Sequence, residues 1–211
     1  MTAATVSMSI GMQTAVRQRL EGMFHTSGFP GTCPVPFTPA ASGKLHTYPY
    51  TAIRLPPGAR TLLVLLTVGT RCIAVLVSTR MVITRVFLPT IPQSLFRGSV
   101  FDGYLETSHD SMTFHAVDCL AFKGCHDRTF SYNQRMIGLG SFLQSVGPAE
   151  DQPSSGMRIT RADTVPLGLM PKSGTWIAMP EDLGLYPARN HPDMYIICMD
   201  DISTLLPLET S

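Results

Sequence analysis

The stretch Leu62–Leu76 reads LLVLLTVGTRCIAVL, in which a short polar segment separates two runs of apolar residues. Large aliphatic and β-branched residues fill both runs, and a glycine lies between them, which is typical of two strands joined by a tight turn. We predict strands over 61–67 and 71–77 with a turn at Val68–Thr70. The run is shorter than the roughly 20 residues of a membrane span and contains Arg71, so we interpret it as protein core.

Similar patterns on either side of this stretch predict an α+β domain dominated by antiparallel β-sheet. A helix is predicted at 11–24 and another at 129–145. The proline-rich tract Thr26–Gly43 is predicted to be an extended arm without regular structure, and Glu150–Gly156 a loop. We therefore divide the chain into an N-terminal helix and arm, residues 1–44, and a domain over 45–211. The further strands are predicted at 81–87, 99–107, 112–122, 165–170, 174–179 and 194–199.

The composition limits the classes of function. Apolar residues make up 44% of the chain and charged residues 15%, so the chain can bury a core and is not of the disordered class. The formal net charge of +1 argues against a protein that binds nucleic acid through its overall charge. The five cysteines form no paired spacing, and the first residues lack the pattern of a secretory signal. We expect an intracellular protein of the cytoplasm or nucleus, with no membrane partner.

Four short segments follow one another in a fixed order. They are TVGTR at Thr67–Arg71, FDGYLE at Phe101–Glu106, FHAVDCLAFKG at Phe114–Gly124 and PLGLMPK at Pro166–Lys172. These segments resemble the conserved blocks of the covalent nucleotidyltransferase superfamily, which comprises mRNA-capping guanylyltransferases and DNA and RNA ligases. The similarity covers roughly residues 45–180, and Arg135 follows the third block at a distance. It implies a guanylyltransferase-like fold, without the oligonucleotide-binding domain that usually accompanies the active enzymes.

The chain departs from this family at the positions that carry its chemistry. The lysine that forms the covalent lysyl–nucleotide bond corresponds to Leu66, and the acidic residue of the same block corresponds to Val68. The glutamate of the second block corresponds to Tyr104, and the acidic residue of the fourth block to Leu167. Leucine cannot replace an amine nucleophile, and apolar side chains cannot hold a hard metal ion. The resemblance therefore implies a pseudoenzyme, similar to the cap-binding domains of the snurportin type, which also lack the lysine.

The resemblance also implies a set of binding residues. Several of them have ordinary alternatives: Tyr104 as a space-filling residue, Trp176 as a core residue, and Lys123 or Lys172 as exposed turn residues. We expect no catalytic residue, metal ligand or cofactor. The spacing of His115, Cys119, Cys125 and His126 fits no common zinc site. The implied nucleotide- or cap-binding residues are Thr67, Arg71, Phe87, Tyr104, Phe122, Lys123, Lys172 and Trp176.

The function expected from the sequence is non-covalent binding of a guanine nucleotide or an RNA cap by a catalytically degenerate domain. One alternative is a divergent active guanylyltransferase in which Lys44, Lys123 or Lys172 acts as the nucleophile. Another is an interaction module whose former pocket is filled and which serves within a larger complex. The arm over 26–43 is the expected docking segment for a protein partner.

Overall fold

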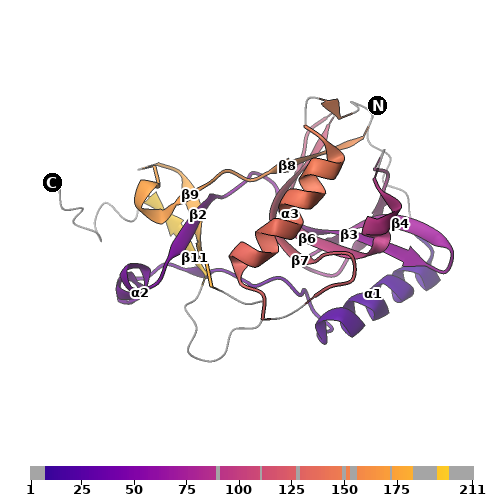
Figure 1. Ribbon diagram of the computed structural model, residues 1–211, viewed down its shortest axis with the longest axis horizontal. Helices are drawn as coiled ribbons and strands as arrows, with labels where there is room; N and C mark the ends of the chain where they lie inside the picture. Colours follow the sequence, from indigo (N-terminus) through magenta and orange to yellow (C-terminus); the bar gives the residue numbers. More distant parts are fainter. Residues whose placement is uncertain are drawn as a thin grey trace. The chain divides into compact units, whose positions relative to one another are not determined.

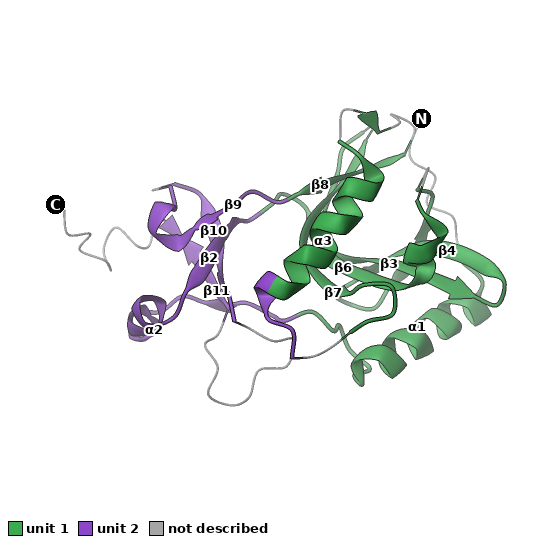
Figure 2. Cartoon of the chain, viewed as in Figure 1, with its two compact units in different colours: residues 1–31, 56–127, 134–161 green, residues 32–55, 128–133, 162–211 purple. Residues whose placement is uncertain are grey.

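The computed structural model describes residues 8–88, 91–109, 111–126, 129–148, 151–152, 156–171, 173–182 and 194–199. Within them the chain is α+β, and its two sheets are mostly antiparallel, as predicted. The contacts divide the chain into two compact units (Figure 2), which do not follow the predicted boundary at residue 44. Unit 1 comprises residues 1–31, 56–127 and 134–161, and unit 2 comprises residues 32–55, 128–133 and 162–211.

Unit 1 contains a six-stranded sheet in the order β5-β4-β3-β6-β7-β8. All of its pairings are antiparallel except that of β7 with β8. The predicted strands of this unit are therefore confirmed, whereas β8 was not predicted. The strands are β3 (Ala59–Val68), β4 (Arg71–Ser78), β5 (Ile83–Val86), β6 (Arg97–Thr107), β7 (Met112–Ala121) and β8 (Met157–Arg161).

The β3–β4 hairpin forms at the stretch Leu62–Leu76. Its ladder of pairs ends at Val68 and Arg71, so the loop consists of Gly69 and Thr70. Gly69 has a φ of 61°, the left-handed backbone that the first central residue of such a loop requires. β3 is buried over Thr61–Leu66 without interruption, because both faces of the sheet are covered.

A helix covers each face of this sheet in Figure 1. Leu63 and Leu65 belong to a core cluster with residues of α3 (Tyr132–Val146), in which the rings of Phe101 and Phe142 stack at 3.9 Å. Side chains alternate along a strand, so Leu62, Val64 and Leu66 lie on the opposite face. The predicted N-terminal helix is α1 (Ile10–Phe24), and it packs against β3. Its buried residues are Val16, Leu20, Met23 and Phe24.

Two buried ion pairs connect the elements of unit 1. Arg135 of α3 donates from Nε and Nη2 to the two carboxylate oxygens of Asp118 on β7, at 2.9 and 2.7 Å. Arg60 of β3 donates from Nε to Asp102 on β6 at 3.1 Å, and Nη2 reaches the second oxygen. Burial raises the pKa of the Asp102 carboxyl above its ordinary value, and the Arg60 guanidinium acts in the opposite direction. The charges are thus paired by two hydrogen bonds each, which buried ion pairs require.

Glycine is required at two places around these pairs. A side chain at Gly103 would collide with the carbonyl oxygen of His115, because β6 and β7 approach closely at a register shift. A side chain at Gly31 would collide with a carboxylate oxygen of Asp102. The Asp-Gly pair at 102–103 therefore has a structural role in the sheet: one residue neutralises Arg60 and the other permits the strands to approach.

The outer edge of β8 is covered by a side chain. The amide of Gln152 donates to the carbonyl oxygen of Ile159 at 2.9 Å and accepts from the Ile159 N–H at 2.7 Å. This contact replaces the bonds of a neighbouring strand at the centre of β8. Exposed strand edges pair readily with other chains, so Gln152 protects this edge.

Unit 2 contains a five-stranded sheet in the order β1-β11-β10-β2-β9. Within the tract 26–43 the structure contains β1 (Val35–Pro36), a short 3-10 helix and the start of α2 (Ser42–Thr47), so the prediction of an irregular arm was wrong there. β1 pairs with β11: the Val35 N–H donates to the carbonyl oxygen of Met194 and the Phe37 N–H to that of Ile196, both at 2.9 Å. The other strands are β2 (Tyr50–Arg54), which was not predicted, β9 (Thr164–Pro166), β10 (Thr175–Pro180) and β11 (Tyr195–Cys198).

Among the described residues, no helix has the length and hydropathy needed to span a bilayer.

The Asp118–Arg135 pair yields the first prediction. Arg135→Ala should lower the free energy of unfolding by about 3–5 kcal/mol, because it leaves a buried carboxylate without its partner. The double variant Asp118→Leu/Arg135→Met should lose less than this single variant, since no charge then remains buried. Urea denaturation measures both, with the exposed Arg158→Ala as the matched control. A larger loss in the double variant would contradict the assignment of a paired buried charge.

The second prediction concerns pH. In Arg60→Gln the Asp102 carboxyl loses the group that lowers its pKa, so the folded-state pKa moves further above the unfolded-state value. An acidic group whose folded-state pKa lies above its unfolded-state pKa lowers the free energy of unfolding as the pH rises from the unfolded-state value to the folded-state value. The stability lost relative to the unsubstituted protein should therefore be larger at pH 7 than at pH 4. Thermal unfolding across this range measures it, and a loss independent of pH would contradict it.

Candidate functional site

One end of the unit 1 sheet collects most of the residues that the sequence motifs singled out. Five neighbouring strands each contribute one residue there, at the point where the strand begins or ends. From β5 to β7 these residues are Phe87, Arg71, Thr67, Arg97 and Lys123.

The strand pairing fixes this arrangement. β3 ends and β4 begins at the Val68–Arg71 pair, and Leu66 of β3 lies opposite Arg97 of β6. Val100 pairs with Ala121, so the end of β7 lies beside the start of β6. Phe87 directly follows β5, whose last residue pairs with Ala74 near the start of β4. Adjacent strands are about 4.8 Å apart, so the row from Phe87 to Lys123 spans about 19 Å.

Three of these residues are cations, and we call Arg71, Arg97 and Lys123 the cationic sheet end. All three are exposed, and no ion pair of theirs occurs within the described part of the chain. The segments that carry them, 67–72, 91–99 and 121–126, contain no carboxylate. The positive charge is therefore not neutralised by the strands that present it, although the chain as a whole is almost neutral.

The sequence motifs did not identify Arg97. It is the first residue of β6 and lies outside the motif blocks, so no local pattern distinguishes it. Only its pairing opposite Leu66 places it between Arg71 and Lys123. Arg97 could have been identified as a site residue only from a correct prediction of the β3–β6 register.

Lys123 has an unusual backbone conformation. It has a φ of 51° and Gly124 a φ of 86°, so both central residues of the turn between Phe122 and Cys125 have positive φ. This combination defines the I′ hairpin turn, in which Asn-Gly is preferred. A left-handed backbone costs an ordinary L-residue about 1–2 kcal/mol. Residues held in such conformations concentrate at functional sites.

Hydrogen bonds hold this turn in place beside β6. The Lys123 N–H donates to the hydroxyl of the buried Ser99 at 3.0 Å, and the Gly124 N–H donates to the carbonyl oxygen of Gly98 at 3.0 Å. The Lys123 ammonium lies 5.0 Å from the centre of the Phe122 ring, within the range of a cation–π contact. Phe122 itself packs against the α3 core cluster, so its role at the site is to support the lysine.

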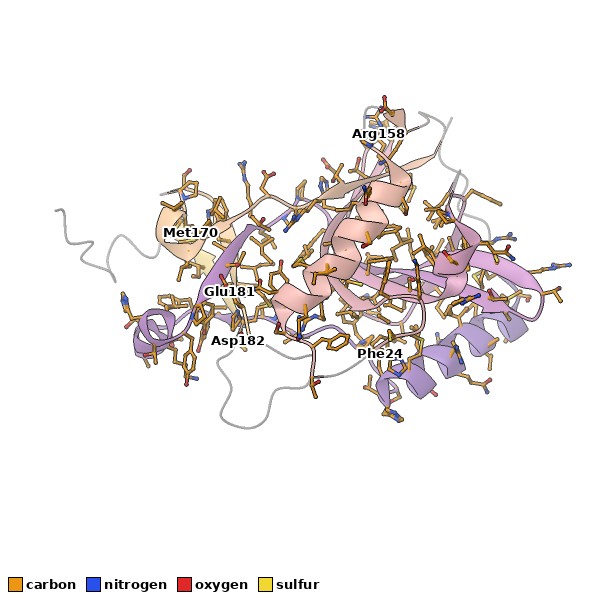
Figure 3. All side chains as sticks on the ribbon, viewed as in Figure 1. Phe24, Arg158, Met170, Glu181 and Asp182 are labelled. Carbon is orange, nitrogen blue, oxygen red and sulfur yellow. The ribbon has the colours of Figure 1, made fainter. Side chains whose placement is uncertain are left out.

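The end of α1 lies next to the same turn. The ring of Phe24, labelled in Figure 3, meets the ring of His126 edge-on at a centroid distance of 6.2 Å. His126 Nδ1 lies 2.9 Å from the carbonyl oxygen of Gly124, which can only accept, so Nδ1–H donates a hydrogen bond to it. These contacts hold the end of the segment that follows Lys123.

Phe87 and Thr67 differ in what they can offer a ligand. Phe87 is 54% exposed, and the Arg85 guanidinium lies 5.1 Å from the centre of its ring. The hydroxyl of Thr67 donates to the carbonyl oxygen of Phe96 at 3.0 Å. Thr67 thus connects β3 to the 3-10 helix Gln93–Phe96 and acts as a structural residue, whereas Phe87 presents an aromatic surface.

Leu66, which the sequence resemblance aligns with a nucleophilic lysine, is inside the core. It is 1% exposed and lies on the sheet face of Leu62 and Val64. Val68, which the same resemblance aligns with an acidic residue, is half-buried at the end of the strand. Neither side chain can supply an amine or a metal ligand.

Of the remaining candidate residues, one lies toward the other end of the unit 1 sheet, one belongs to unit 2 and one is outside the described residues. Tyr104 lies opposite Arg60 near the start of β3, seven positions along β6 from Arg97, or about 23 Å. Trp176 belongs to unit 2, is 3% exposed, and donates from Nε1 to the carbonyl oxygen of Ser173 at 2.9 Å. Lys172 lies outside the described residues.

A second polar group lies toward the other end of the sheet. His115 of β7 lies 3.1 Å from the Thr160 hydroxyl through Nδ1 and 2.9 Å from the Glu106 carboxylate through Nε2. It connects β6, β7 and the parallel edge strand β8.

Burial raises the pKa of the Cys119 thiol, which keeps it uncharged and unreactive. Within the described ranges, no group of three or more potential ligands could hold a metal ion.

No protein-family model matches this chain, and a comparison with curated proteins finds no match.

Proposed function

We propose that this protein is a catalytically degenerate guanylyltransferase-like domain that binds a guanine nucleotide or an RNA cap without a covalent bond. The observation that carries the proposal is the cationic sheet end: three exposed cations without ion-pair partners among the described residues, next to the exposed ring of Phe87. Nucleotide recognition without base-specific contacts uses two elements. Cations attract the phosphates, and an aromatic ring stacks on the base.

The conformation of Lys123 supports this assignment independently. A lysine in the left-handed region costs stability that asparagine or glycine would restore, and its side chain has no ion-pair partner in the part of the chain that the structure describes. A function in binding gives a physical reason for this residue at this turn.

The buried Leu66 supports binding without covalent catalysis. Of the alternative nucleophiles of an active enzyme, Lys123 belongs to unit 1 and Lys44 to α2 of unit 2. The segments 67–72, 91–99 and 121–126 contain no carboxylate that could hold, beside Lys123, the metal ion that nucleotidyl transfer requires.

The third prediction separates the charge of Lys123 from its strain. Lys123→Asn should weaken binding of a cap analogue several-fold and raise the free energy of unfolding by about 1 kcal/mol, because asparagine accepts this backbone more readily. Lys123→Gln should weaken binding to the same extent without the gain in stability. Calorimetric titration and urea denaturation measure the two effects. Unchanged binding in both variants would remove Lys123 from the site.

The fourth prediction tests the absence of covalent chemistry. Incubation with radiolabelled GTP and Mg²⁺ or Mn²⁺ should give no alkali-stable, acid-labile protein–GMP adduct, the behaviour of a lysine phosphoramidate, since no lysine occupies the position of Leu66. An adduct that disappears when Lys44, Lys123 or Lys172 is replaced would establish the active-enzyme alternative. If the protein neither forms an adduct nor binds nucleotide or cap at millimolar concentration, the interaction-module alternative is favoured.

A further inference from the structure

From the row of residues on successive strands, we infer that the cationic sheet end binds a single-stranded oligonucleotide, and that one nucleotide fills only part of it. This inference rests on the proposed function for the location of the site. It extends the proposed function by naming the preferred ligand, which is an oligonucleotide with several phosphates and not a single nucleotide.

The length of the row is the first argument. Arg71 on β4 and Lys123 after β7 are three strand intervals apart, about 14 Å, and Arg97 lies between them. Phosphates along one strand of a duplex follow at about 3.4 Å, and those of an extended strand are further apart. The row therefore matches a length of several nucleotides, of which each cation can contact a different phosphate.

The position of the aromatic ring is the second argument. Phe87 lies at the β5 end of the row, one strand beyond Arg71, with 54% of its surface exposed. A strand whose backbone follows the three cations can place a base on this ring. Stacking of bases on aromatic residues along a positively charged groove is the mode by which proteins bind single strands of varied sequence. An acidic peptide could use the cations but would gain little from the ring.

The rigidity of the row is the third argument. Each cation is attached to a strand end within one hydrogen-bonded sheet, and the Lys123 turn is further fixed by its bonds to Ser99 and Gly98. The spacing of the backbone positions that carry the charges is therefore set before any ligand binds, which lowers the entropic cost of binding a chain of phosphates.

The test is fluorescence anisotropy with labelled hexauridylate, carried out with the full chain beside GTP and a cap dinucleotide as competitors. Hexauridylate should bind at least tenfold more tightly than either competitor. With three phosphates neutralised, the logarithm of the association constant should fall with the logarithm of salt concentration with a slope of about −2. Between 50 and 200 mM salt this corresponds to roughly 15- to 20-fold weaker binding.

Substitutions locate the binding. Arg71→Gln, Arg97→Gln and Lys123→Gln should each weaken binding and reduce the slope by about 0.7. Phe87→Ala should weaken binding at least about fivefold at every salt concentration, without a change in slope, and Phe87→Leu should not restore it. The controls are Arg80→Gln and Arg158→Gln, two exposed arginines away from this end of the sheet; Arg158 is labelled in Figure 3. Circular dichroism confirms that each variant is folded.

The outcomes separate this inference from the proposed function. If the cap dinucleotide or GTP binds as tightly as hexauridylate, and does so through Arg71 and Lys123, the oligonucleotide inference is overturned and the proposed function stands. If hexauridylate alone binds, the inference stands and the proposed function is overturned. If an acidic peptide such as hexaglutamate displaces hexauridylate equally well, or if the control variants lose as much affinity as the site variants, the inference is overturned.

Discussion

The burial of β3 on both faces is the constraint on which the rest of unit 1 depends. Six consecutive residues, Thr61–Leu66, are buried, so this strand must have a partner on each side and a covered face above and below. β4 and β6 provide the partners, and α1 and the α3 cluster cover the faces. Once β3 is fixed in this way, its end determines where β4 begins and where β6 begins. The candidate site is a consequence of these strand ends.

The motif residues divide into a framework and a surface. The carboxylates of Asp102 and Asp118 are each paired with an arginine inside the fold, and Gly103 permits the close approach of two strands. The sheet needs these residues for charge pairing and for the close approach of its strands, so their presence has a structural reason that requires no chemistry. Arg71 and Lys123 have no comparable structural role among the described residues, because their side chains are exposed and no ion pair holds them.

The fold could be predicted where a strand or helix is specified by its own residues. The hairpin 61–77 and the helix at 10–24 have complete local patterns, and both were correctly predicted. β8 and β2 are short, and their positions depend on pairing with distant strands, which no local pattern reveals. The site shows the same limit. Arg71 and Lys123 could be selected from the sequence, but the position of Arg97 beside them depends on the register between β3 and β6. The distance of Tyr104 from Arg71 and Lys123 depends on register as well, since the pairing of β6 with β3 and β7 places Tyr104 opposite Arg60 and His115.

The distribution of charge at this sheet end resolves an apparent conflict with the composition. A net charge of +1 excludes recognition of nucleic acid through the overall field of the molecule, but a screened field acts only over about 10 Å in 0.1 M salt. A ligand at the cationic sheet end meets Arg71 on β4, Arg97 on β6 and Lys123 after β7, and charges much farther away than the screening length contribute little. Asp102 and Asp118 are each neutralised by their own arginine inside the fold. The local field is therefore set by strand register, and it remains positive in a chain that is almost neutral.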